Sequence, residues 1–577
     1  VVDDGAMFYW NGNLIHRYNM PSGTITATNN ASAAIGNAAL RSPVTIPLTN
    51  LVVGINVLAV EVHQARISGD DIAFGAELSA TVEAIPAVPF SESPEQWIEL
   101  FNRSSNRVDL TGWRLDEGVD FRFAAGTKIE PGGYLVVAKD PAALLARFPG
   151  IAAVGPFTNG LSHRGERLAL KDAADNPADV VRYFDGGRWP GAADGDGSSL
   201  ELRDPRADNS VGEAWAASDE RPRSPWRSYS YRGIAAASPV GPDGQWKEFV
   251  MGMLASGEVL LDDISVIETP GGTPVQLIQN GTFETGTNKW RIIGNHYGEV
   301  INDPDQPGNK VLRLVAYGGT DHMSNHGETT FANSRDVVNG REYEISFRAK
   351  WISGSRQFHT RLYFNRLART TLLEAPALHG TPGARNSAFA ANLGPTYTEF
   401  RHAPAVPAPL APVTVSVRAT DPDGVAALTL WWAVDGGAWS SAPMALASVE
   451  GAPEYSASIP GKAAGTIVHF YVQGADALGA ASTFPAAGPN ARALYKVDDG
   501  LAATNGLHNI RLIVKKSDAD WMHNNLNVMS NKRIGCTMIY DEREIFYGVG
   551  LRLKGSEHSR TVNERMGFNV NLHSDQL

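Results

Sequence analysis

The sequence WIELFNRSSNRVDLTGWRL, residues 97–115, decides the fold expected for this chain. Two apolar runs flank a polar Arg-Ser-Ser-Asn segment, which is typical of two strands joined by a turn. The run PGGYLVVAKD, residues 131–140, predicts a third strand, and PAALLARF follows it at residues 141–148. Asp140 as N-cap and Pro141 at the first helical position predict one short helix there. Strands separated by Gly- and Pro-containing turns predict a small β-sandwich.

The same pattern extends along the chain and predicts an all-β protein of tandem β-sandwiches. A length of 577 residues corresponds to about four to five domains. The 58 glycines and 34 prolines suit a chain with many turns and disfavour long helices. Asn11-Gly12 predicts an early hairpin, because this dipeptide supplies the two positive-φ residues of a type I′ turn. Leu51–Val62 predicts a buried core strand.

Composition and charge exclude several classes of protein. The formal net charge of −12 lacks the basic character of a nucleic-acid-binding surface, so no nucleic acid is expected as a partner. Cys536 is the single cysteine, which rules out an intrachain disulfide. No run of about 18 apolar residues occurs, so no transmembrane segment is predicted. The chain begins without Met and ends just after a strand-like run, and both ends are expected to continue in a longer protein.

The three strand motifs between residues 97 and 140 resemble the lamin-tail domain, an immunoglobulin-like sandwich, and the module is assigned to residues 88–210. Residues 1–85 resemble the jelly-roll modules found beside such domains in large bacterial secreted proteins. The resemblance implies a bacterial protein with an extracellular or cell-surface location.

Residues 212–385 contain NGTFE at residues 280–284, a following tryptophan and YEISFRAK at residues 343–350. This succession resembles a carbohydrate-binding jelly roll. In that family an aspartate pair closes the module, whereas the pair at residues 262–263 precedes the NGTFE opening. Residues 212–385 are therefore either two partial modules or one module in permuted order.

A glycan site needs exposed aromatic faces for sugar rings and a few polar groups. Candidates gather in this jelly-roll-like module: Trp290, His296, Tyr297, Tyr317, His322 and His326. The alternative for Trp290 is a place in the hydrophobic core, which a sequence alone does not separate from an exposed face. The alternatives for the loop Asp321–His326 are a polar rim, a metal site and an ordinary loop.

Structural calcium is expected at three residues, Asp262, Asp263 and Glu284, because they match positions where carbohydrate-binding jelly rolls hold this ion. Asp194 and Asp196 are a second candidate, since their spacing is that of half a calcium loop; the alternative is an Asp/Gly turn. Asp421-Pro422-Asp423-Gly424 predicts a tight turn, with calcium as the alternative.

The end of the chain predicts three further segments. Residues 386–412 are rich in Pro and Ala and predict a semi-rigid linker. Alternation in residues 413–497 predicts an immunoglobulin- or fibronectin-type sandwich. In residues 505–577, a strand, a helix over residues 517–529 with Ser517 as N-cap, and the strand GVGLRLKG follow one another. This succession resembles the opening of CotH-type atypical kinase domains, which are α+β.

That resemblance implies that Lys554 holds phosphate in the full-length protein, with Mg-ATP as cofactor. The alternative is an ordinary lysine at the end of a strand. Gly548-Val549-Gly550 is too short to indicate a nucleotide-covering loop. Phosphoryl transfer also needs carboxylates that hold Mg²⁺, and no such set follows Lys554, so no catalytic residue is expected in the 577 residues.

The sequence therefore predicts an extracellular binding and scaffold protein with a glycan as the leading ligand. One alternative is a secreted CotH-like kinase whose catalytic part lies beyond Leu577. The other is a structural surface or filament protein whose modules pack on neighbouring copies of the chain.

Overall fold

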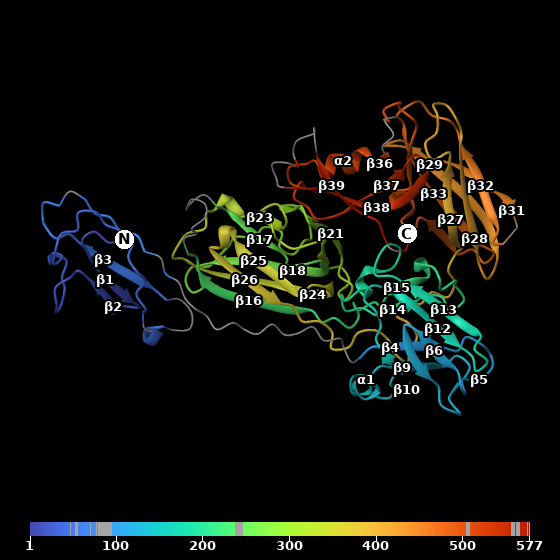
Figure 1. Ribbon diagram of the computed structural model, residues 1–577, viewed down its shortest axis with the longest axis horizontal. Helices are drawn as coiled ribbons and strands as arrows, with labels where there is room; N and C mark the ends of the chain where they lie inside the picture. Colours follow the sequence, from blue (N-terminus) through green and yellow to red (C-terminus); the bar gives the residue numbers. More distant parts are fainter. Residues whose placement is uncertain are drawn as a thin grey trace. The chain divides into compact units, whose positions relative to one another are not determined.

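The computed structural model describes residues 1–46, 48–51, 56–69, 71–76, 78, 95–236, 246–448, 451–502, 508–555, 560, 566–573 and 575 (Figure 1). The chain divides into two compact units, Val1–Glu92 and Ser93–Leu577. Strands dominate both units, while α1 (Pro141–Arg147) and α2 (Lys516–Met522) have only seven residues each. The prediction of an all-β chain of tandem sandwiches is confirmed. No helix in the described part of the chain combines the length and the apolar character needed to cross a membrane.

The first unit contains one antiparallel sheet in the order β2-β1-β3, with bounds Gly5–Trp10 for β1, Asn13–Tyr18 for β2 and Leu58–His63 for β3. Asn11 and Gly12 have φ angles of 49° and 81°, which confirms the predicted hairpin turn. The described residues supply this single sheet and not the two facing sheets expected of a jelly roll. The strand predicted over Leu51–Val62 begins only at Leu58. Residues 52–55 of that prediction lie outside the described residues, and so does the predicted domain boundary at residue 85.

The lamin-tail-like module, residues 95–217, has two facing sheets. The first has the order β10-β9-β4, and the second the order β11-β7-β6-β12-β13. Their bounds are Trp97–Phe101 (β4), Tyr134–Ala138 (β9), Ala153–Val154 (β10), Arg114–Glu117 (β6), Val119–Arg122 (β7), Thr158–Asn159 (β11), Glu166–Lys171 (β12) and Pro177–Tyr183 (β13). Two short ladders join β5 (Val108–Asp109) to β8 (Lys128–Ile129) and β14 (Leu200–Leu202) to β15 (Trp215–Ala217).

The core of this module and its helix follow from the sequence pattern. Leu115 and Val119 from one sheet pack with Leu135 and Val137 from the other. A carboxylate oxygen of Asp140 accepts the Ala143 N–H at 3.0 Å, so the predicted N-cap of α1 is confirmed.

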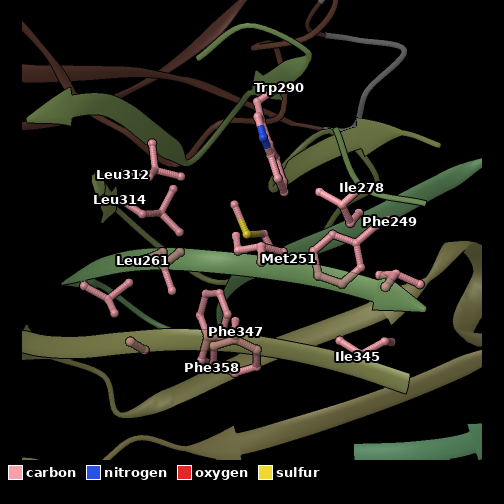
Figure 2. Close-up of a cluster of buried hydrophobic side chains, with 14 of the residues drawn as sticks. Phe249, Met251, Leu261, Ile278, Trp290, Leu312, Leu314, Ile345, Phe347 and Phe358 are labelled. Carbon is pink, nitrogen blue, oxygen red and sulfur yellow. The ribbon is translucent and has the colours of Figure 1, made fainter. Parts of the chain in front are cut away.

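Residues 227–372, the jelly-roll-like module of the sequence analysis and below called the jelly roll, form a β-sandwich of two sheets around one core. Its first sheet has the order β16-β24-β18-β22-β21, with β19 beside β18, and its second the order β20-β23-β17-β25-β26. The bounds are Arg227–Ile234 (β16), Glu248–Met253 (β17), Gly257–Glu268 (β18), Val275–Gln276 (β19), Trp290–Ile292 (β20), His296–Asn302 (β21), Lys310–Ala316 (β22), Gly327–Thr330 (β23), Glu342–Gly354 (β24), Gln357–Leu362 (β25) and Leu367–Leu372 (β26). Both sheets contain strands from before and after NGTFE. Phe249, Leu261, Leu312 and Phe347 fill the space between the sheets (Figure 2).

The immunoglobulin-like module also has two sheets, in the orders β27-β28-β32-β31 and β30-β29-β33-β34, with β35 beside β33. Its strands are Thr396–Ala403 (β27), Val413–Thr420 (β28), Val425–Val434 (β29), Ser440–Pro443 (β30), Ala445–Ser448 (β31), Glu454–Ile459 (β32), Ile467–Asp476 (β33), Ala481–Phe484 (β34) and Leu494–Lys496 (β35). The linker predicted over residues 386–412 is therefore wrong for β27. Tyr397 and His402 of that strand are buried, and it pairs along its length with β28.

Residues 377–391, here called the strap, are bound to the lamin-tail-like module and are not a free spacer. The carboxylate of Glu201 accepts hydrogen bonds from the Ser387 hydroxyl at 2.8 Å and the Ala388 N–H at 3.0 Å. Glu220 accepts the Gly380 N–H at 2.9 Å. Glu201 and Glu220 are 3% and 2% exposed, so these hydrogen bonds are made to carboxylates that are almost fully buried.

The C-terminal module is an antiparallel sheet in the order β36-β37-β38-β39, with α2 packed against it. The strands are Ile510–Ile513 (β36), Ile534–Tyr540 (β37), Glu544–Lys554 (β38) and Gly567–Asn571 (β39). The helix predicted over residues 517–529 is shorter. It begins at Lys516, its N-cap Lys515 makes no side-chain capping bond, and it ends at Met522.

Candidate functional site

Two tyrosines predicted to bind a ligand lie on the same surface of the jelly roll. Tyr297 on β21 pairs with Val315 on β22, and Tyr317 follows β22 directly, so alternation directs both side chains to the same side. Tyr297 is 44% exposed and Tyr317 is 43% exposed, in contrast to the fully buried Leu312 and Leu314 of the opposite face. Exposed ring faces of this kind are what a sugar-stacking site requires.

A lysine from the C-terminal module lies between these rings. The ammonium nitrogen of Lys532 is 4.6 Å from the ring centroid of Tyr317, 5.8 Å from that of Tyr297 and 5.5 Å from that of Trp521 on α2. In the described part of the chain, Lys532 has no ion-pair partner, so the rings are the main electrostatic contact of its charge. Burial lowers the pKa of Lys532. We call Tyr297, Tyr317, Trp521 and Lys532 the tyrosine–lysine face.

A charged cluster borders this face. The Arg313 guanidinium donates two hydrogen bonds to Glu258, at 2.7 and 2.8 Å, and one to Glu299 at 2.6 Å. The hydrogen bonds that Arg313 donates to these carboxylates raise the pKa of its guanidinium. The Tyr297 hydroxyl lies 3.5 Å from Glu299. Because Glu299 pairs with Arg313 across β21 and β22, both carboxylates and both rings occupy one outward face of the sheet.

Polar side chains fix the loop that carries Lys532. The Ser530 hydroxyl donates to the Gly294 carbonyl at 2.9 Å, and the Asn531 side chain donates to Asp321 at 3.2 Å. Asp321 also accepts the Asn325 side chain at 2.7 Å. The position of Lys532 against the jelly roll is therefore set by several directional contacts.

Trp290 does not belong to this face. It is 7% exposed and packs in the jelly-roll core, where its ring lies perpendicular to that of Phe249 (Figure 2). Its indole N–H donates to the Asn280 carbonyl at 3.0 Å. The expectation of an exposed stacking face is wrong for Trp290, and the alternative of a core tryptophan holds, because its ring packs against Phe249 and Phe283.

The three histidines predicted for the site separate from the tyrosines. His296 is 4% exposed, accepts the Met253 N–H at 3.1 Å, and has its pKa lowered to about 4 by burial. His326 is 1% exposed and lies 3.1 Å from Glu328. His322 accepts the Ser324 N–H at 3.2 Å in the loop between them. His296 and His326 are thus interior groups, and neither offers its ring to a ligand on the surface.

The carboxylates predicted for calcium have protein partners. Asp262, whose pKa is raised by burial, accepts the Asn309 side chain at 3.0 Å and the Arg348 guanidinium at 3.3 Å. Arg348 also lies 3.5 Å from Asp263, so one guanidinium faces both aspartates. Glu284 accepts the Lys310 N–H at 3.2 Å and is not joined to the pair by any contact between described residues. Calcium at these residues stays a prediction.

The other acidic residues considered for calcium lie in or beside turns. Asp194 and Asp196 follow a 3-10 turn, and burial raises the pKa of each. Among the described residues, one group of three possible ligands is close enough for a metal, Asp421, Asp423 and Asp476, with carboxylate oxygens within 4.8 Å of one another. There Arg206 already lies 2.9 Å from Asp423. The Gly424 N–H donates to the Asp421 carbonyl at 3.1 Å, which confirms the predicted tight turn.

Lys554 is the last residue of β38 and is exposed. Gly548, Val549 and Gly550 lie inside β38, where Val549 pairs with Cys536 across the sheet. A nucleotide-covering loop is therefore not formed by these glycines. The phosphate-binding role of Lys554 stays a prediction.

The sequence did not single out Lys532, Trp521 or Arg313. Lys532 lies more than 200 residues from the tyrosines in the sequence, and no local motif marks it. The period-2 pattern of β22 places Arg313 beside Tyr317, which is the one signal that points to it.

Comparison with known proteins gives a match to part of the chain. No curated protein matches the chain. A solved structure, Escherichia coli alpha-2-macroglobulin activated by porcine elastase, aligns with 10% identity and a TM-score of 0.15, over 96% of this chain and 45% of that one. The chain thus spans less than half of that structure. Residues 81–185 match the family model described as Lamin Tail Domain, which confirms the resemblance predicted from the three strand motifs for this part of the chain.

Proposed function

We propose that this protein is an extracellular or cell-surface binding and scaffold protein whose jelly roll binds a glycan on the tyrosine–lysine face. One observation carries the proposal. Tyr297 on β21 and Tyr317 directly after β22 are both more than two-fifths exposed, and both rings contact the ammonium group of Lys532. Tyrosine rings offer a large apolar contact area at small conformational cost, which suits stacking against the C–H face of a sugar.

The groups beside the rings supply hydrogen bonds. Glu258 and Glu299 can accept bonds from sugar hydroxyls, while Lys532 is a donor. Arg313 holds the two carboxylates in place by its three hydrogen bonds. A surface with apolar faces and oriented polar groups matches a neutral, polyhydroxylated ligand.

Contacts between modules support the scaffold part of the proposal. The jelly roll is fixed to the C-terminal module through Ser530 and Asn531, and the strap fixes the lamin-tail-like module to the chain that enters β27. A set of modules held by directional contacts presents its binding faces in a constant arrangement.

The test is binding of the purified chain to an array of neutral oligosaccharides, followed by calorimetry with the best ligand. We expect Tyr297→Ala and Tyr317→Ala each to weaken binding about tenfold or more, equivalent to ~1.4 kcal/mol. Leu372→Ala is the matched control, because Leu372 is 62% exposed on β26 of the other sheet. Equal binding by wild type and both tyrosine variants, or no binding to any neutral glycan, contradicts the proposal.

A further inference from the structure

A pocket opens on the second sheet of the jelly roll, at β20 and the segment after β23. Its volume is about 460 Å³. Its polar lining residues are Gln279, Lys289, Arg291, Thr330, Asn333 and Ser334, and the buried Trp290 and Phe331 lie behind them. This size lies within the range of small-molecule sites, about 300–1,000 Å³. The tyrosine–lysine face is built from other residues on the other sheet, so the two sites are separate.

The pocket carries positive charge in a chain whose net charge is −12. Lys289 is exposed, and no carboxylate pairs with its ammonium among the described residues. Arg291 donates from Nε to Glu328 at 2.7 Å, and both of its terminal nitrogens lie 3.3 Å from the Thr330 hydroxyl. A guanidinium has five N–H groups, so two of those on Arg291 remain for a ligand. Glu328 is also engaged by His326, which leaves the pocket with an excess of cationic groups.

Uncharged polar groups complete the lining. The side chains of Gln279, Asn333 and Ser334 have no hydrogen-bond partner in the described part of the protein. Asn333, Ser334 and Lys289 have left-handed φ angles of 56°, 51° and 75°. Residues other than glycine rarely adopt this conformation, and it concentrates at functional sites. Three such residues around one pocket, with free amide and hydroxyl groups, indicate a site shaped for a polar ligand.

We propose that this pocket binds an acidic sugar, a saccharide unit that carries a carboxylate or sulfate group. Lys289 and Arg291 bind the anionic group through charge-assisted hydrogen bonds. Gln279, Asn333 and Ser334 bind sugar hydroxyls. A bare inorganic anion uses only the two cations and leaves the amides, the hydroxyl and most of the volume without a role. The inference extends the proposed glycan-binding function to a second site with different chemistry.

The experiment is calorimetric titration of the full chain with oligosaccharides of galacturonate, of glucuronate and of sulfated galactose, each compared with a neutral oligosaccharide of equal length. Inorganic sulfate is titrated alone. We expect at least one acidic oligosaccharide to bind, with an affinity that falls about tenfold in Lys289→Ala and falls further as salt is raised. Gln279→Ala is a second variant and is expected to weaken the same ligand. Lys310→Ala is the matched control, since Lys310 lies on β22 of the other sheet.

The double variant Tyr297→Ala/Tyr317→Ala separates the two sites. If an acidic oligosaccharide still binds to this double variant but not to Lys289→Ala, the pocket proposal is supported. If the acidic oligosaccharide no longer binds to the double tyrosine variant but binds unchanged to Lys289→Ala, the pocket proposal is overturned. The proposed function on the tyrosine–lysine face then still stands. Absence of binding by the whole acidic panel, or sulfate binding as tightly as the acidic sugars, also overturns it.

Discussion

The hydroxyl of Tyr547 on β38 lies 2.6 Å from Nδ1 of His402 on β27, so a side chain of the C-terminal module enters the core of the immunoglobulin-like module. His402 Nε2 donates to the Ala405 carbonyl at 3.0 Å, and therefore Nδ1 accepts the proton of the tyrosine. The same hydroxyl accepts the His402 N–H at 3.1 Å. Burial lowers the pKa of His402 to about 4, which keeps the ring neutral in this role.

Tyr547→Phe tests the polar part of this contact. The variant keeps the ring among Phe400 and Phe470 and removes the hydroxyl, which leaves two buried groups of His402 without a partner. We expect a loss of about 1–3 kcal/mol in the free energy of unfolding. Tyr547→Ala also creates a cavity and is expected to cost about 3–5 kcal/mol. Urea denaturation followed by fluorescence measures both. Similar values for the two variants would show that ring packing contributes little.

Lys532→Met tests the contact of the ammonium with the rings. The apolar part of the side chain is kept while the charge that the rings attract is removed, so the junction of the two modules is expected to weaken by about 1 kcal/mol. Hydrogen exchange of the amides at Ser530 and Asn531 is expected to speed up. Lys532→Arg retains a cation and serves as the control. Unchanged exchange in Lys532→Met would mean that the polar contacts alone hold the junction.

Glu99 predicts a dependence of stability on pH. Burial and the nearby Glu201 raise its pKa from 4.5 to about 7, and its carboxylate accepts the Gly383 N–H of the strap. Since the folded form holds this proton more tightly than the unfolded form, the contribution of Glu99 to the free energy of unfolding falls as pH rises from 4.5 to 7. Glu99→Gln removes this loss. We expect its melting temperature to exceed that of the wild type at pH 8 and to match it near pH 4.5. A constant difference across this range contradicts the assignment.

Arg348→Met is expected to be strongly destabilising. Asp262 and Asp303 are 2% and 4% exposed, and Arg348 is the cation that faces both. Removing one partner of a buried ion pair costs about 3–5 kcal/mol, because the remaining charge is left without compensation. Thermal unfolding measures the change. An exposed pair, Arg232 with Glu344, is the control, and Arg232→Met is expected to cost less than about 1 kcal/mol.

The calcium predicted at Asp262, Asp263 and Glu284 is tested separately. An ion that binds only the folded state stabilises it by mass action, so a chelator is expected to lower the melting temperature of the wild type. Equal melting temperatures with EDTA and with added calcium would rule out the ion. The melting temperature with added magnesium is the control, because it shows the effect of a divalent cation that is not specific for calcium.

Strand patterns and turn residues predicted much of the fold. Asn11-Gly12, Asp140 and the strands around residues 97–140 form as expected, because each depends on local geometry that neighbouring residues determine. The sequence does not predict β27, because proline-rich sequence follows it and its pairing with β28 is decided by contacts outside the segment. The strand order of residues 227–372 could not be predicted, because it is set by pairing between segments far apart in the sequence and not by any single motif.

The candidate site was predicted in part. Tyr297 and Tyr317 were identified, and their exposure follows from alternation on β21 and β22. Trp290 also carries an aromatic ring, but its position on β20 places that ring in the core. Whether an aromatic ring faces solvent depends on which face of a sheet is covered, and this is a property of the packed sandwich.

The anchoring of the strap changes how the chain transmits force. If residues 377–391 were free, they would extend under tension to a length of roughly 50 Å, at about 3.4 Å per residue. Because Glu201 and Glu220 hold several points along this segment, a pull on the jelly roll must break those hydrogen bonds before the segment can lengthen. The connection between the jelly roll and the immunoglobulin-like module therefore keeps its length under low force. It can lengthen only after the strap detaches from Glu201 and Glu220.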